Sequence, residues 1–236
     1  MKPIRVIELF SGIGSQAQAL KNLGIPYEVV GISEIDKYAI AGYEAIHGPV
    51  NNLGDITKIE HLPACDLITY SFPCQDLSIA GMKKGMAQGS GTRSALLWEV
   101  GRLLEDMRER KELPEVLLME NVDAIVDRDN KPHFIRWIMF LNELGYNNSY
   151  QILNAKDYGI PQNRNRCFMV SMLGKRTFKF PPRMILDKCL RDYLEENVPE
   201  EYYKTVYSID GIAPTLKTTH PGPGRPKIIE DGGSDE

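Results

Sequence analysis

A cysteine placed after an apolar run is the residue of this chain best suited to chemistry. Cys74 stands in the sequence Pro-Cys-Gln, directly after the strand-like run 67–72. A cysteine thiolate is a strong nucleophile, and the preceding Pro73 restricts the backbone so that the sulfur can project from a sheet edge. A glycine-rich stretch, 81–91, follows and is typical of a loop. We therefore interpret Cys74 as a nucleophile. The remaining cysteines receive the ordinary interpretation of inert, buried thiols: Cys65, Cys167 and Cys189.

A carboxylate and two arginines could assist the nucleophile, the carboxylate by proton transfer and the arginines by their positive charge. Glu120 follows the apolar run 116–119, where partial burial would suit it to donate a proton. A capping or salt-bridged glutamate is the ordinary alternative. Arg164 and Arg166 stand at alternate positions and face the same way if their segment is extended. The pair suits a carbonyl or phosphate group, and a solvated basic pair is the alternative.

A glycine turn near the start of the chain suggests a nucleoside-type ligand. Residues 10–14, Phe-Ser-Gly-Ile-Gly, join a strand-like run to a helical pattern, and glycines there let a ligand approach the backbone. Glu34 follows roughly 20 residues later, where an acid commonly binds ribose hydroxyls. Asp55, after Gly54, is placed to accept from an adenine amino group. Alternatively, the glycines only reverse the chain and both acids lie on the surface.

The elements that must position these residues follow from hydrophobic periodicity. Strand-like and helical patterns alternate along the chain, which predicts an α/β fold with a doubly wound sheet and functional groups at the carboxyl ends of its strands. The predicted strands are 4–10, 27–32, 66–72, 116–119, 146–153 and 167–172, and the predicted helices are 16–23, 36–46, 96–110 and 134–144. The Pro/Gly-rich and then acidic stretch 221–235 is predicted to be irregular.

Composition narrows the class of protein. At 236 residues, 42% hydrophobic and 25% charged, the chain suits one α/β domain with a small appendage. No apolar stretch reaches the roughly 20 residues that span a bilayer, and the strand-like start leaves no room for a signal peptide. We therefore expect a cytoplasmic protein with no membrane partner. The cysteines show no C-x-x-C pair, so no metal site is expected. The net charge of −4 still permits a local basic cleft.

Six segments of the chain resemble the motifs of the cytosine-C5 DNA methyltransferases, in the family's order. They lie within about residues 4–172 and read LFSGIG, SEID, GDIT, SFPCQ, MEN and QNRNR. The resemblance implies a Rossmann-like methyltransferase fold, mostly parallel with one late antiparallel strand. It also implies S-adenosylmethionine as cofactor, double-stranded DNA as substrate and 5-methylcytosine as product. A related subgroup with the same motifs methylates transfer RNA, so RNA is an alternative substrate.

The resemblance also assigns roles to individual residues. It implies that Cys74 adds to C6 of a flipped-out cytosine while Glu120 hydrogen-bonds or protonates N3. Arg166 would hold the cytosine O2, Arg164 would support the site, and Asn121 would help to position the active loop. The implied cofactor contacts are Phe10 and Asp55 at the adenine, Glu34 at the ribose, Gly12 and Gly14 near the methionine part, and Pro73 and Leu96 as walls.

The chain departs from the family's pattern after these motifs. The family's R-x-L-T-type segment and its final helix are missing, although residues 207–216 resemble the stretch just before them. We interpret 1–182 as a catalytic domain and 183–236 as a short, incomplete target-recognition region with an irregular acidic tail. The chain is then one subunit of a split enzyme completed by a second polypeptide, a truncated form, or a non-catalytic remnant that binds cofactor or DNA. A bacterial or phage setting, in restriction–modification or phage self-protection, follows from the family alone.

Overall fold

The computed structural model describes residues 2–73 and 96–189, residue 192, and the short segments 205–208, 212–214 and 226–229. Cys74 and the glycine-rich stretch 81–91 lie outside the described residues. The chain divides into two compact units. The first comprises Met1–Gln151 and Cys167–Lys179, and the second comprises Ile152–Arg166 and Phe180–Glu236. The interpretation of 1–182 and 183–236 as functional domains stays a prediction.

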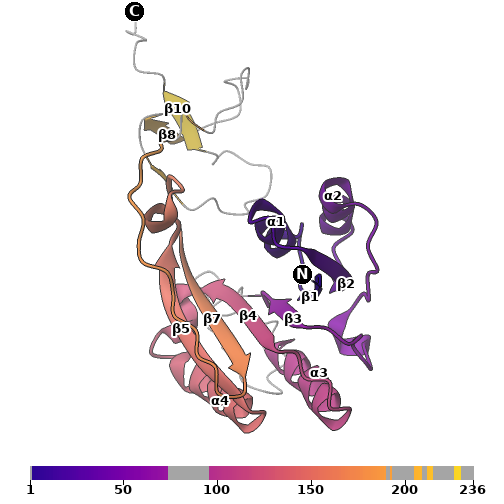
Figure 1. Cartoon of the computed structure of the whole chain (residues 1–236). Coiled ribbons are helices and arrows are strands. Elements are labelled where there is room, and N and C mark those ends of the chain that lie inside the picture. Colours follow the sequence, from indigo (N-terminus) through magenta and orange to yellow (C-terminus); the bar gives the residue numbers. More distant parts are fainter. Residues whose placement is uncertain are drawn as a thin grey trace, which may run out of the picture. The chain divides into compact units, whose positions relative to one another are not determined.

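One six-stranded sheet organises the first unit, in the order β2-β1-β3-β4-β7-β5 (Figure 1). Its strands are β1 (Ile4–Leu9), β2 (Tyr27–Ser33), β3 (Leu67–Tyr70), β4 (Val116–Val122), β5 (Tyr146–Asn154) and β7 (Asn165–Leu173). The pairs β1–β2, β1–β3 and β3–β4 are parallel.

Strand β7 runs against its neighbours. At its end, Leu173 N–H donates to the carbonyl of Glu115, just before β4, at 2.9 Å. The next residue, Gly174, donates to the carbonyl of Gly145, just before β5, at 3.1 Å. The end of β7 therefore lies beside the starts of both neighbours, as it does only in antiparallel pairs. This confirms the predicted α/β fold with one late antiparallel strand.

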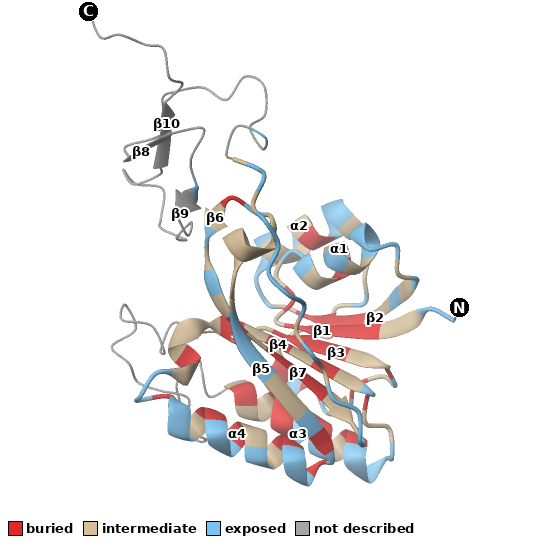
Figure 2. Ribbon diagram, turned by 60° about the vertical axis from the view of Figure 1, so that its left-hand side comes forward, coloured by how far each residue is buried: buried red, intermediate tan, exposed pale blue. Residues whose placement is uncertain are grey.

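Helices cover both faces of the sheet (Figure 2). Helices α1 (Ser15–Asn22) and α2 (Lys37–His47) lie on one face, and α3 (Leu97–Glu109) and α4 (Lys131–Glu143) lie on the other. Helix α2 begins after Asp36, whose carboxylate accepts from the N–H groups of Tyr38 and Ala39 as an N-cap. Helix α4 begins three residues earlier than predicted, because Pro132 is accepted in its first turn.

The core lies where α3 and α4 pack on the sheet. Helix α3 buries an i, i+3, i+4 stripe of Leu97, Val100, Leu104 and Met107. In α4, the buried Trp137 donates through Nε1 to the hydroxyl of Tyr70 on β3 at 3.2 Å. Two cysteines belong to this core, and burial raises the pKa of each thiol to about 12: Cys65 and Cys167.

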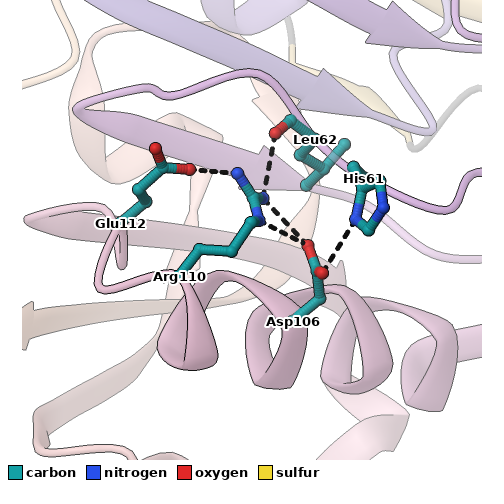
Figure 3. Close-up of polar contacts among 5 residues, drawn as sticks. All are labelled: His61, Leu62, Asp106, Arg110 and Glu112. Atoms are coloured by element: carbon teal, nitrogen blue, oxygen red, sulfur yellow. Dashed lines mark hydrogen bonds and ion pairs between the residues drawn. The ribbon is translucent and has the colours of Figure 1, made fainter.

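A polar network joins the end of α3 to the segment before β3 (Figure 3). Asp106 binds Nδ1 of His61 and the guanidinium of Arg110, both at 2.8 Å. Arg110 also donates to the Leu62 carbonyl at 3.1 Å and pairs with Glu112. Because Leu62 precedes β3, the network lies at the amino ends of the strands, away from the edge where functional groups are expected.

Short strands characterise the second unit. β6 (Gln162–Asn163) pairs with β9 (Ala213–Pro214), and β8 (Thr205–Ser208) pairs with β10 (Pro226–Ile229), both in parallel. The prediction of an irregular tail is therefore wrong for 226–229. The sequence misled here because proline and glycine surround this strand, whose partner β8 supplies the backbone hydrogen bonds. No helix in the described part of the chain is long and apolar enough to cross a membrane.

Candidate functional site

The glycine turn after β1 has the backbone shape of a ligand-binding turn. Three of its residues adopt left-handed conformations, with φ of 57° at Phe10, 55° at Gly12 and 81° at Gly14. A side chain at Gly12 would meet no atom within 4 Å, so the backbone is open to approach there. Ser11 N–H donates to the carbonyl of Ser33 at 3.3 Å, which ties the turn to the end of β2. In a sheet of this order, β1 and β3 flank the topological switch point, where such folds bind ligands.

Glu34 reaches from the end of β2 to this turn. Its Oε2 accepts from the Gly12 N–H at 2.9 Å, and its Oε1 accepts from the N–H groups of Ile35 and Asp36 at 2.8 and 2.9 Å. The predicted ribose acid and the predicted methionine-side glycine are therefore in direct contact. The carboxylate also fixes the turn to the start of α2.

Asn52 is a positioning residue that the sequence reasoning missed. Its Oδ1 accepts from the N–H groups of Glu34 at 3.2 Å and Gly54 at 3.0 Å, and its Nδ2 donates to the Glu34 carbonyl at 3.0 Å. The adjacent Leu53 N–H donates to Ile32 of β2 at 2.7 Å. Glu34 and the Gly54-Asp55 segment thus share one scaffold. The available signal was an asparagine shortly before the predicted adenine acid.

Asp55 has a local role in the fold. Its Oδ1 accepts from the backbone N–H of Thr57 at 3.0 Å and from the Thr57 hydroxyl at 2.8 Å, capping the short helix η1 (Ile56–Lys58). Hydrogen bonds from the Thr57 backbone and then from its side chain lower the pKa of Asp55. The carboxylate therefore stays an acceptor, which the predicted adenine contact requires.

The residues before Cys74 are fixed from two sides. Gln16, in the first turn of α1, donates to the Ser71 hydroxyl at 3.3 Å. Asn121 of β4 is buried, and its Nδ2 donates to the Phe72 carbonyl at 3.0 Å. Pro73, one of the predicted cofactor walls, is the last described residue of this segment. The chain therefore enters the Cys74 position from an anchored backbone.

Glu120 lies inside β4 rather than at its end, because the strand continues to Val122. The last β3–β4 pair is Tyr70 with Met119, so Glu120 is the first β4 residue beyond that ladder. It is half-buried, whereas its neighbour Asn121 is buried on the opposite face. Leu96, the other predicted wall, is the N-cap of α3 and packs partly buried against the core.

The two arginines belong to the second unit. Arg164 precedes β7 and Arg166 is within it; both are half-buried, whereas Asn163 and Asn165 are exposed. This alternation fits the expectation that the arginines face the same way. Asn154 anchors the segment, because its Oδ1 accepts from the Arg164 N–H at 3.2 Å and its Nδ2 donates to both exposed asparagines.

The comparisons with known proteins identify the family. Residues 4–226 match the family described as C-5 cytosine-specific DNA methylase. The chain belongs to this family. The C5 methylases transfer a methyl group from S-adenosylmethionine to C5 of cytosine in DNA. Among the described residues, no group of three or more His, Cys, Asp or Glu side chains is arranged to hold a metal ion.

Curated C5 methylases resemble this chain at the level of sequence. It is 37% identical to the type II methyltransferase M2.ScrFI of Lactococcus lactis subsp. cremoris, over 85% of this chain and 70% of that protein. It is 38% identical to the orphan methyltransferase M.SssI of Spiroplasma monobiae, over 74% of this chain and 60% of that protein. The first alignment runs over 256 positions, more than the 236 residues of this chain, so the Lactococcus protein carries internal segments that this chain lacks.

A solved structure supports the fold. The S. pombe Dnmt2 methyltransferase superposes with a TM-score of 0.73 at 23% identity, covering 98% of this chain and 77% of its own. At this identity the likeness concerns the fold alone. The Dnmt2 protein and this chain thus share one fold.

Proposed function

We propose that this chain is the catalytic part of a DNA cytosine-C5 methyltransferase, with Cys74 as nucleophile. The hydrogen bond from Asn121 to the Phe72 carbonyl is the observation that carries the proposal. It ties β4, which bears Glu120, to the backbone two residues before Cys74. A nucleophile and a proton donor are then held by one short connection, as covalent catalysis on a ring requires.

The glycine turn fits S-adenosylmethionine as the cofactor. A carboxylate offers about four acceptor positions, and three backbone N–H groups bond to Glu34, which leaves capacity for a ribose hydroxyl. Open space beside Gly12 suits the methionine part, and Asp55 lies on the same Asn52-linked scaffold for the adenine. Phe10, Gly14, Pro73 and Leu96 complete the proposed contacts. When bound, S-adenosylmethionine supplies an electrophilic methyl group.

The proposed chemistry activates a poor carbon nucleophile. The Cys74 thiolate adds to C6 of a flipped-out cytosine while Glu120 hydrogen-bonds or protonates N3, which moves electron density to C5. After C5 has taken up the methyl group, loss of the C5 proton to water expels the sulfur and restores the thiolate, and any proton placed on N3 returns to Glu120. Arg166 holds the cytosine O2, and Arg164 supports the site.

A second polypeptide is proposed to complete sequence recognition. This is supported by the internal segments that the Lactococcus relative has and this chain lacks. Reading base edges in the major groove needs a surface of the protein that enters it. The proposed setting is the cytoplasm of a bacterium, or a phage-infected bacterium, in restriction–modification or phage self-protection.

Methyl transfer tests the proposal directly. The purified chain is incubated with tritiated S-adenosylmethionine and duplex DNA, alone and with lysate of its source. Label in DNA from the chain alone would show that it is sufficient, and label only with lysate would support a partner polypeptide. Label in RNA but not DNA would favour the RNA alternative. Cofactor binding without covalent trapping by 5-fluorocytosine DNA would favour the non-catalytic remnant and contradict the proposal.

A further inference from the structure

A carboxylate lies fully buried directly beneath the glycine turn. Glu8 of β1 has 0% exposure, and its Oε1 accepts from the Ala17 N–H at 3.0 Å. Its Oε2 accepts from the hydroxyl of Tyr43, on α2, at 2.5 Å. Burial raises the pKa of Glu8, which the hydrogen bonds from Tyr43 and Ala17 oppose. A buried carboxylate is stable only where such donors are in place.

This carboxylate substitutes for a missing helix cap. Helix α1 has Gly14 at its N-cap, which makes no side-chain cap hydrogen bond. The N–H groups of a first helical turn lack partners within the helix. Glu8 provides one for Ala17 from the strand below, so the start of α1 depends on where Tyr43 holds that carboxylate.

A second contact from α2 reaches the turn itself. Nε2 of His47 lies 3.2 Å from the carbonyl oxygen of Ile13. The imidazole ring of His47 packs on the ring of Tyr43, with the ring centroids 4.7 Å apart. The two rings also occupy the space beside Gly14. A Cβ there would lie 2.6 Å from both Tyr43 Cε2 and His47 Nε2. The side of the turn facing α2 is therefore filled, whereas the side at Gly12 is open.

We propose that Tyr43 and His47 are positioning residues that hold the glycine turn in the shape that binds S-adenosylmethionine. The inference rests on the proposed function. The turn contains three left-handed residues, a combination that a free chain rarely adopts. Helix α2 keeps it populated through Glu8 and the Ile13 carbonyl. Without these contacts only a fraction of molecules is ready to bind, and the apparent Kd rises by the inverse of that fraction.

The test compares two buried tyrosines. Tyr43→Phe removes the donor to Glu8. Tyr146→Phe is the matched control. Tyr146, the first residue of β5, is also buried, and its hydroxyl donates to the Pro114 carbonyl at 2.8 Å. For each full-length variant, calorimetry gives the Kd for S-adenosylmethionine. Hydrogen exchange in the cofactor-free protein gives the exchange rate of the Ala17 amide.

For Tyr43→Phe we expect a Kd about tenfold higher, as loss of one hydrogen bond to a charged group predicts, and faster exchange at Ala17. Tyr146→Phe should lower the melting temperature without changing either quantity. An unchanged Kd in a folded Tyr43→Phe protein would overturn the inference, whether or not exchange at Ala17 changes. If Tyr43→Phe does not fold, His47→Phe replaces it, because this variant keeps a ring against Tyr43 but loses the Ile13 contact. A higher Kd for S-adenosylmethionine would then support the inference, and an unchanged Kd would overturn it.

The two proposals fail in different ways. Wild-type protein that does not bind S-adenosylmethionine would contradict the proposed function. Exchange at Ala17 needs no cofactor and would then decide the inference by itself: faster exchange in Tyr43→Phe would support a holding role for α2, and unchanged exchange would overturn it.

Discussion

Single residues near the carboxyl ends of β3 and β4 carry the proposed chemistry. Asn121 holds the Phe72 carbonyl, and Gln16 holds the Ser71 side chain, so the chain is anchored up to the second residue before Cys74. Glu120 lies one position before Asn121 and faces the opposite side of β4. One strand thus both anchors the nucleophile's segment and supplies the proposed proton donor.

Cys74→Ser should abolish methyl transfer and leave cofactor binding nearly intact. The hydroxyl is a far weaker nucleophile than a thiolate, whereas the proposed cofactor contacts come mainly from other residues. Tritium transfer to DNA and calorimetry with S-adenosylmethionine measure the two effects. A folded variant that loses cofactor binding would count against the role assigned to Cys74.

Asn121→Ala should reduce the methyl-transfer rate at saturating cofactor. It leaves the Phe72 carbonyl without its side-chain donor, which destabilises the anchored backbone by about 1–3 kcal/mol. Asn130→Ala is the matched control, because Asn130 is also buried and its Nδ2 donates to the Ala124 carbonyl at 2.9 Å, in the turn before α4. Urea unfolding and kcat are measured for both. Equal losses of kcat would show that Asn121 matters only for stability.

At the scale of elements, the turn between β1 and α1 is held by its neighbours. The end of β2 reaches it through Glu34 and Ser33, and α2 reaches it through Tyr43 and His47. Its own sequence supplies the glycines that tolerate the left-handed conformations. The loss of stability caused by a substitution within the turn should therefore depend on which neighbouring residues the new side chain contacts.

Gly14→Ala should destabilise the protein more than Gly24→Ala. Both glycines have positive φ, 81° and 65°, so each alanine incurs about 1–2 kcal/mol of backbone strain. Only at Gly14 does the new Cβ collide with Tyr43 and His47, whereas at Gly24 nothing lies within 4 Å. Melting temperatures of the two variants check this difference. Equal decreases in melting temperature for the two variants would show that α2 shifts to accommodate the new Cβ with little loss of stability.

At the scale of the whole molecule, the two ends of the strands have different roles. Proposed chemistry gathers at the carboxyl ends, and the network of His61, Asp106 and Arg110 secures α3 to the segment before β3 at the amino ends (Figure 3). This separation lets acid stability be tested without touching the candidate site.

Asp106→Asn should weaken the acid dependence of stability. Burial alone would raise the pKa of Asp106, but hydrogen bonds from Arg110 and His61 outweigh it and hold the pKa below the ordinary 3.8. The ionised carboxylate therefore stabilises the folded protein above pH 3.8, and this contribution disappears as the pH falls through the lowered pKa.

Urea unfolding of wild type and Asp106→Asn measures this effect. The difference should be about 1 kcal/mol at pH 7 and should shrink as the pH falls below 4. Glu109→Gln, an exposed carboxylate on the same helix, is the control and should follow wild type. A difference that stays constant from pH 7 to pH 3 would contradict the assignment.

The order of the motifs and the alternation of strands and helices were readable from the sequence. Both depend on local signals, namely hydrophobic periodicity, glycines after β1 and a proline before Cys74. They were enough to predict the α/β sheet and to place Glu34 at the end of β2, and the resemblance to the C5 methylases added the one antiparallel strand. Strand ends were not predicted correctly from the sequence. The predicted strand 116–119 continues to Val122 as β4, because a polar residue such as Glu120 does not by itself end a strand.

Tertiary structure alone decided which of these residues meet. The sequence determined the family, the fold class and the candidate residues, since each is written in neighbouring amino acids. It did not show that Glu34 binds the Gly12 N–H, that Asn52 links Glu34 to Gly54, or that Tyr43 of α2 binds Glu8. Apart from the local Asn52–Gly54 hydrogen bond, these contacts join residues 18 to 35 positions apart. They exist because strand register and helix packing bring the residues together, and no local pattern encodes a distance of that kind.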